Sequence, residues 1–176
     1  FLPWLGFYAK ITRADVFVLL DDVQFTQGQN KHNWTTRVKI LGPNGSLWLS
    51  VPVRRAGLGL QRIFELKTLE NDVRWLNKLI RTLKNSYCKT PHYQEVAPPL
   101  LDILLGHNGP ICETNIALIQ CITAMLGMKT RVVKSSELKV EGTSNQRLIN
   151  LTLAEGGTTY LAGDGAEDYQ VIDQFK

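Results

Sequence analysis

Two adjacent carboxylates, Asp21 and Asp22, follow a run of apolar residues and are the first candidates for chemistry in this chain. A carboxylate at a strand end can bind Mg²⁺, accept a hydrogen bond from a sugar hydroxyl or act as a general base. Neighbouring residues on a strand point to opposite faces, so we expect only one of the two to enter a given site. We predict both as catalytic residues and Gln24 as a substrate-binding residue. The alternative is that the two carboxylates only cap and solvate a turn.

Polar residues and glycines also follow two later predicted strands, at residues 130–134 and 158–161. Ligands of open α/β sheets bind beyond the carboxyl ends of the strands, where these segments would share one edge with the carboxylates. The substrate-binding residues predicted there are Ser135, Ser136, Gly163 and Asp164. The alternatives are helix or turn capping for the serines and a plain turn for the glycine-rich segment.

A long stretch of the chain, residues 23–64, contains no Asp or Glu, although the whole chain has 16 acids in 176 residues and a net charge of +4. A positive surface of this kind attracts phosphate, nucleotides or nucleic acid, and arginines bind diphosphate or carboxylate groups bidentately. The substrate-binding residues predicted in it are His32, Asn33, Arg37, Lys39 and Arg54. Trp34 and Trp48 are predicted as core or cross-strand partners, with stacking on a sugar or base as the alternative. A solvated basic face without a ligand is the other interpretation.

Familiar cofactor and metal motifs are absent from the sequence. It contains no GxGxxG, GxxxxGK[ST], GxSxG or HExxH pattern, and its three histidines lack metal-ligand spacing. We therefore predict no metal site and identify no cofactor. The three cysteines form no CxxC pair, and their odd number argues against a disulfide framework, as expected for a reducing cytoplasm.

The elements that must position these residues follow from hydrophobic periodicity and turn signals. Strands are predicted at residues 15–20, 34–41, 46–53, 130–134 and 158–161. Helices are predicted at residues 5–13, 71–87, 93–105, 113–126, 146–154 and 167–175. Asn44 and Gly45 favour a hairpin with a loop of about four residues between the second and third strands, and Pro98 and Pro99 either begin or kink the third helix.

The order of these elements predicts an α/β fold. A parallel or mixed sheet would carry helices on both faces in a Rossmann-like arrangement. The hairpin at 34–53 and the helical segment at 71–126 would be insertions in one domain spanning residues 1–176, which is expected to be truncated at both ends. No apolar run reaches the length of a membrane-spanning helix, so a soluble cytoplasmic protein is expected.

Six segments together resemble the WbqC-like protein family, in order and over essentially the whole chain. They read FLPWLGFYAKI, DVFVLLDDVQF, NWxxRVKI, LWLSVPV, VVKSSEL and TYLAGDGAEDY. In that family a strand ending in Met-Gln-Pro precedes the first motif, and a further portion follows the last. The resemblance thus also implies truncation at both ends.

The resemblance implies a bacterial protein associated with O-antigen, lipopolysaccharide or related glycan biosynthesis. It suggests a transferase that modifies an activated amino sugar, by acyl or aminoacyl transfer. The expected partner is an anionic small molecule, either a nucleotide sugar or an activated acyl donor, with tRNA as the one nucleic acid that could serve as a donor. The alternatives are a non-catalytic nucleotide- or glycan-binding module and a nucleotidyltransferase-like nucleotide-binding protein.

Overall fold

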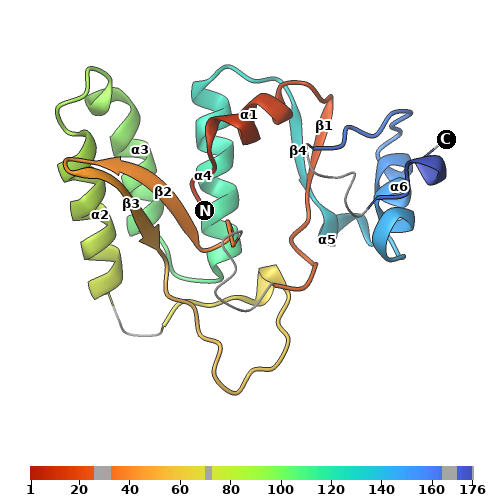
Figure 1. Cartoon of the computed structure of the whole chain (residues 1–176), viewed down its shortest axis with the longest axis horizontal. Coiled ribbons are helices and arrows are strands. Elements are labelled where there is room, and N and C mark those ends of the chain that lie inside the picture. The colour runs from red at the N-terminus through yellow and green to blue at the C-terminus, as the bar shows by residue number, and fades with distance from the viewer. Residues whose placement is uncertain (26–32, 70–72, 164–169, 176) are drawn as a thin grey trace. The chain divides into compact units, whose positions relative to one another are not determined.

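The computed structural model describes residues 1–25, 33–69, 73–163 and 170–175 (Figure 1). The chain forms two compact units. Unit 1 comprises Phe1–Leu5 and Val23–Met128, and unit 2 comprises Gly6–Asp22 and Lys129–Lys176. The single domain with inserted segments stays a prediction. The observed fold is mixed α/β, and the Rossmann-like arrangement of a sheet with helices on both faces also stays a prediction.

Unit 2 is built on a parallel pair of strands, β1 (Val16–Leu19) and β4 (Arg131–Lys134), which lie side by side in Figure 1. The register places Val16 opposite Arg131 and Leu19 opposite Lys134. The helices of this unit are α1 (Leu5–Ile11, whose first residue belongs to unit 1), α5 (Ser135–Leu138), α6 (Ser144–Ala154) and the short 3-10 helix η3 (Ile172–Phe175). The parallel pairing predicted from the apolar run at 15–20 is confirmed.

The strand predicted at residues 158–161 is wrong, because that segment has no regular secondary structure. A strand needs a neighbouring ladder for its backbone groups, and in the described residues β1 and β4 pair only with each other. Tyr160 instead stacks on Phe175 of η3, with ring centroids 5.1 Å apart. The helix predicted at 167–175 lies partly outside the described residues, and its described end is the 3-10 helix η3.

Unit 1 contains the predicted hairpin, made of β2 (Arg37–Gly42) and β3 (Gly45–Ser50). Its turn is shorter than predicted, because Gly42 pairs with Gly45 and only two residues connect the strands. Gly45 has a φ of +108°, which side-chain-bearing residues rarely adopt. Val38 and Ile40 are buried on one face, so Arg37 and Lys39 share the other, as the alternation predicted.

The helices of unit 1 are α2 (Arg74–Tyr87), α3 (Tyr93–Leu105) and α4 (Ile111–Met125), with a 3-10 helix η1 (Ile63–Glu65). Helix α3 continues through Pro98 and Pro99. These prolines leave the carbonyls of Gln94 and Glu95 without intrahelical donors, and both residues are exposed to water. Gly127 follows α4 with a φ of +65°, the expected C′ conformation.

The core of unit 1 joins the hairpin to the helices. Its fully buried apolar side chains are Phe25, Leu66, Leu104, Ile111 and Leu118. Hairpin residues such as Val38 and Leu49 belong to the same cluster, which fixes the polar face of the hairpin relative to α2. Within the described ranges, no helix combines the length and hydropathy needed to cross a membrane.

Candidate functional site

A polar cluster lies at the carboxyl ends of β1 and β4, and its centre is Asp21. The side chain of Asp21 is 3% exposed and accepts hydrogen bonds from the backbone N–H of Ser136 (2.9 Å), the Ser136 hydroxyl (2.6 Å) and the Ser135 hydroxyl (3.1 Å). Because β1 and β4 are parallel, both strands deliver their following residues to the same edge. The prediction that Asp21, Ser135 and Ser136 meet there agrees with this geometry.

Asp22 is the more accessible carboxylate of the cluster. It accepts a hydrogen bond from Ser135 Oγ at 2.6 Å and forms an ion pair with the guanidinium of Arg147 from α6. The exposed fractions are 14% for the Asp22 side chain and 20% for Arg147. We call Asp21, Asp22, Ser135, Ser136 and Arg147 the carboxylate cluster. Through Asp22 and Arg147 it offers solvent both an acceptor and a cation.

Arg147 was absent from the predicted site. The residues around Arg147 in the sequence do not distinguish it from other basic residues on helices, because its partner Asp22 lies 125 positions earlier. The sequence feature that could have pointed to this region is Gly142, whose backbone φ of +116° favours glycine. A Cβ at that glycine would lie 3.2 Å from the backbone nitrogen of Arg147. Glycine thus lets the preceding loop pack closely on the first turn of α6.

A second candidate site, the cationic pocket, lies within unit 1 and has a volume of about 740 Å³. Its charged lining residues are Arg37 of β2, Arg55, and Lys78 of α2, and no carboxylate lines it in the described part of the chain. Trp48 and Trp75 also line it, and the Arg37 guanidinium lies 4.6 Å from the centroid of the Trp48 ring. Three cations around one pocket attract an anionic ligand, and the indoles offer faces for a base or sugar.

Three tryptophans form an exposed row in unit 1. The ring centroids of Trp4 and Trp34 are 4.9 Å apart, and those of Trp34 and Trp48 are 6.0 Å apart. All three side chains are exposed, so Trp34 and Trp48 are not core residues. The other half of the prediction, a cross-strand partner, fits Trp48, which stands opposite Lys39 in the hairpin and contacts Arg37 of β2. Their mutual packing keeps them in place at the surface, and the alternative, stacking on a ligand, remains open to them.

The remaining predicted residues are placed as follows. Asn33 lines the cationic pocket, Lys39 lines a different pocket, and Gln24 is exposed and forms an isolated β-bridge with Arg62. Arg54 does not line the cationic pocket, where its neighbour Arg55 is found instead. Gly163 lies in unit 2, where an added Cβ would be 3.3 Å from Lys10 Nζ. His32 and Asp164 lie outside the described residues.

His107 follows α3 in unit 1 and lies between two threonine side chains. Its Nδ1 lies 2.6 Å from Thr114 Oγ1 and its Nε2 lies 3.1 Å from Thr68 Oγ1, with the ring edge-on to Trp75. Burial lowers the pKa of His107 below its usual 6.5, because the charged imidazolium loses hydration there. The neutral ring suits this position, since it donates at one nitrogen and accepts at the other.

This pKa shift predicts how stability depends on pH. The unfolded chain binds a proton at His107 near pH 6.5, whereas the folded chain resists it, so stability falls as the pH drops through that value and is complete above it. Urea unfolding at about pH 7.5 and about pH 5.5 measures this loss. We expect His107→Gln to lose less stability on acidification than the wild type. His92→Gln, at an exposed site, is the control. An equal loss in wild type and His107→Gln would contradict the prediction.

Comparisons with known proteins identify the family of this chain. The model of the WbqC-like protein family matches residues 1–176. The chain is 31% identical over 170 residues to the uncharacterized protein Rv1507c of Mycobacterium tuberculosis, an alignment that covers 96% of this chain and 71% of that protein. No solved structure matches the chain.

Proposed function

The chain belongs to the WbqC-like protein family, and from this premise we propose that it is an enzyme of bacterial surface glycan biosynthesis. The proposed reaction modifies an activated amino sugar by acyl or aminoacyl transfer. The observation that carries the proposal is the cationic pocket, with Arg37, Arg55 and Lys78 around one cavity and Trp48 beside them. Nucleotide-linked sugars and activated acyl donors both present phosphate groups that such cations bind.

The tryptophans support a ligand that also carries rings. A nucleoside base or a sugar offers a flat or apolar face that stacks on an indole, while its phosphates pair with arginine. Trp48 is exposed and lines the pocket beside Arg37, so one ligand can use both kinds of contact. A bare inorganic anion would use only the cations.

We propose the carboxylate cluster, which lies within unit 2, as an acceptor site of its own, in which Asp22 orients or deprotonates the acceptor and Arg147 holds Asp22 in place. Asp21 is a positioning residue, since its oxygens already accept hydrogen bonds from Ser135 and Ser136. Asp22 is more accessible, because 14% of its side chain is exposed. We thereby propose only one carboxylate of the predicted pair as the catalytic residue. The expectation that the two would point to opposite faces is wrong, because both contact the Ser135 hydroxyl.

The proposal is tested by calorimetric binding of uridine diphosphate and of a uridine-diphosphate amino sugar at low salt. We expect Arg37→Ala and Lys78→Ala each to weaken binding about tenfold or more, as loss of one charge-assisted hydrogen bond predicts. Lys84→Ala is the matched control, because Lys84 lies on the same helix but outside the cationic pocket. Equal weakening by Lys84→Ala, or no binding of either compound, would refute the proposed site.

A non-catalytic binding module is the second candidate function, and the internal bonding of the carboxylate cluster favours it. Both aspartates already have protein partners, which is usual for carboxylates that only stabilise a fold. This candidate predicts the same binding of nucleotide sugars without turnover. Mass spectrometry of mixtures of amino sugar and acyl or aminoacyl donor separates the two functions. A new acylated sugar that disappears with Asp22→Asn supports the enzyme.

A further inference from the structure

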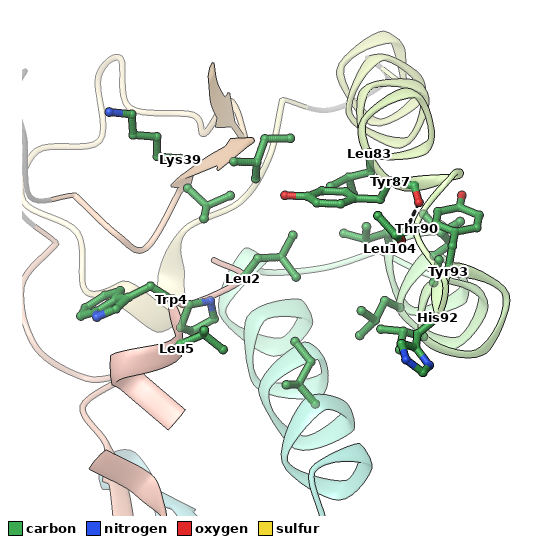
Figure 2. A pocket seen from close by; sticks show the side chains of 18 residues that line it. Leu2, Trp4, Leu5, Lys39, Leu83, Tyr87, Thr90, His92, Tyr93 and Leu104 are labelled. Carbon is green, nitrogen blue, oxygen red and sulfur yellow. Dashed lines mark hydrogen bonds between the residues drawn. The ribbon is translucent and has the colours of Figure 1, made fainter. Parts of the chain in front are cut away.

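Two other pockets of unit 1 differ in their polar groups. One is apolar, with a volume of about 460 Å³, and Figure 2 shows Leu83 and Leu104 among the side chains that line it. The histidine in its lining, His92, is exposed and lies 3.4 Å from a carboxylate oxygen of Glu95. The other, which we call the histidine pocket, has a volume of about 420 Å³ and is lined by His107. Its histidine contacts a hydroxyl at each ring nitrogen.

Three segments of unit 1 bring these polar groups together. His107 follows the C-cap residue of α3, Thr114 lies near the start of α4, and Thr68 lies between η1 and α2. The backbone N–H of Ile111 donates to the Leu66 carbonyl at 2.8 Å, which holds the start of α4 against the segment that contains Thr68. Ile111 and Leu66 are fully buried. The core of unit 1 therefore positions the histidine and both hydroxyls.

His107 lies between a reachable hydroxyl and a buried one. Its Nε2 is 3.1 Å from Thr68 Oγ1, and its Nδ1 is 2.6 Å from Thr114 Oγ1. A neutral imidazole carries one N–H, so one of these hydroxyls accepts from the ring and the other donates to it. Thr114 is buried, whereas Thr68 is half-buried and lines the pocket. Thr68 is thus the hydroxyl that a ligand in the pocket can reach.

A hydroxyl, a histidine and a third group that orients the histidine form the arrangement of a nucleophile with its general base. Both distances at His107 lie in the range of hydrogen bonds. Burial lowers the pKa of His107, so the ring is neutral at neutral pH and can accept a proton. Lys67 and Asn108 also line the pocket, and both carry N–H donors for a carbonyl or phosphate oxygen.

We infer that Thr68 is a nucleophile that accepts the acyl group of an activated acyl donor, with His107 as its general base and Thr114 as a positioning residue. The inference rests on the proposed acyl transfer and adds a covalent step to it. The Thr68 oxygen bonds to the acyl carbon, and the bond from that carbon to the leaving oxygen breaks. The Thr68 proton passes through His107 Nε2 to the leaving group. An amine or hydroxyl of the acceptor then attacks the ester carbon, and its proton ends on the Thr68 oxygen.

The test uses p-nitrophenyl acetate as the acyl donor and the whole chain as the catalyst. We expect a burst of one p-nitrophenolate per protein, and one acetyl group on the peptide that contains Thr68, located by mass spectrometry. Hydroxylamine should remove this group, because it cleaves an ester but leaves the amide that Lys67 would form. The absence of a burst, or acetylation of Lys67 alone, overturns the inference.

Variants assign the three roles. Thr68→Val keeps the shape of the side chain without its hydroxyl and should lose both the burst and the ester, whereas Thr68→Ser should keep both. His107→Gln should slow the burst about a hundredfold or more, the contribution typical of a general base. Thr114→Val should slow it less, and Thr114→Ser should restore the rate, because it restores the hydroxyl that orients the ring. A burst that survives in Thr68→Val contradicts the inference.

Two controls separate this chemistry from folding. Thr90→Val and His92→Gln remove a hydroxyl and an imidazole outside the histidine pocket and should leave the burst unchanged. Urea unfolding checks that each variant is folded. If Thr68→Val does not fold, the position of the acetyl group in the wild type still decides the question.

The outcomes distinguish this inference from the proposed function. If Thr68 forms the ester but no mixture of donor and amino sugar yields an acylated sugar, the inference stands and the proposed function fails. If an acylated sugar forms while Thr68 stays unmodified and Thr68→Val remains active, transfer is direct. In that case the inference is overturned and the proposed function stands.

Discussion

Replacing Asp21 with alanine should lower the free energy of unfolding by about 3–5 kcal/mol, the largest loss we expect from any single change in the carboxylate cluster. The side chain is buried and accepts hydrogen bonds from the Ser136 hydroxyl and the Ser136 backbone N–H, and its removal leaves both donors without this acceptor. The Ser135 hydroxyl keeps Asp22, its nearer acceptor. Each hydrogen bond to a charged group contributes about 1.5–3 kcal/mol. Urea unfolding followed by circular dichroism measures the change.

Asp15→Ala is the control for this prediction. Asp15 is exposed and stands just before β1, in the same segment as Asp21. A surface substitution of this kind changes stability by no more than about 0.5 kcal/mol. If Asp21→Ala destabilised the protein no more than Asp15→Ala, Asp21 would not hold the edge of the parallel sheet together.

Replacing Arg147 with alanine should lower the free energy of unfolding by about 2–4 kcal/mol. The change leaves Asp22 as a mostly buried carboxylate without its cation, and such losses exceed the value of the ion pair itself. The double variant Asp22→Ala/Arg147→Ala should therefore be less destabilised than the sum of the two single variants. A coupling energy of about 1–3 kcal/mol in this cycle is the expected result.

The control for Arg147 is a second cation–carboxylate pair in unit 2, formed by Lys134 and Glu137. Its carboxylate is open to water, since the Glu137 side chain is 61% exposed. Water screens such a pair, and Glu137→Ala should lower stability by less than about 1 kcal/mol. Additive effects of Asp22→Ala and Arg147→Ala would show that the two side chains do not stabilise one another.

The parts of the fold that were predicted correctly are those that local pattern determines. The apolar run at 15–20 identified β1, and alternation in the hairpin placed Arg37 and Lys39 on one face. The helices α2, α3, α4 and α6 followed from their periodicity. In each case one face of a single element must be buried, and that requirement is visible within a few turns or residues.

The errors arose where the outcome depends on a distant partner. The segment at 158–161 has residues suited to a strand, but a strand forms only beside another, and Tyr160 packs on Phe175 instead. Lys78 and Arg147 reach their sites from helices far along the chain from Arg37 and Asp22. The residues next to Lys78 and Arg147 in the sequence give no sign of these long-range contacts, because the contacts depend on how the whole chain folds.

Ser135 has one hydroxyl hydrogen and two carboxylate acceptors, Asp22 at 2.6 Å and Asp21 at 3.1 Å. At any moment the Ser135 hydrogen bonds mainly to the nearer oxygen, that of Asp22. If a sugar hydroxyl donated to Asp22, the Ser135 hydrogen could turn towards Asp21. The sugar would then bind without a net loss of hydrogen bonds within the protein. A ligand group that cannot donate a hydrogen bond would offer no such exchange, so the serine would favour acceptors that carry an O–H or N–H group.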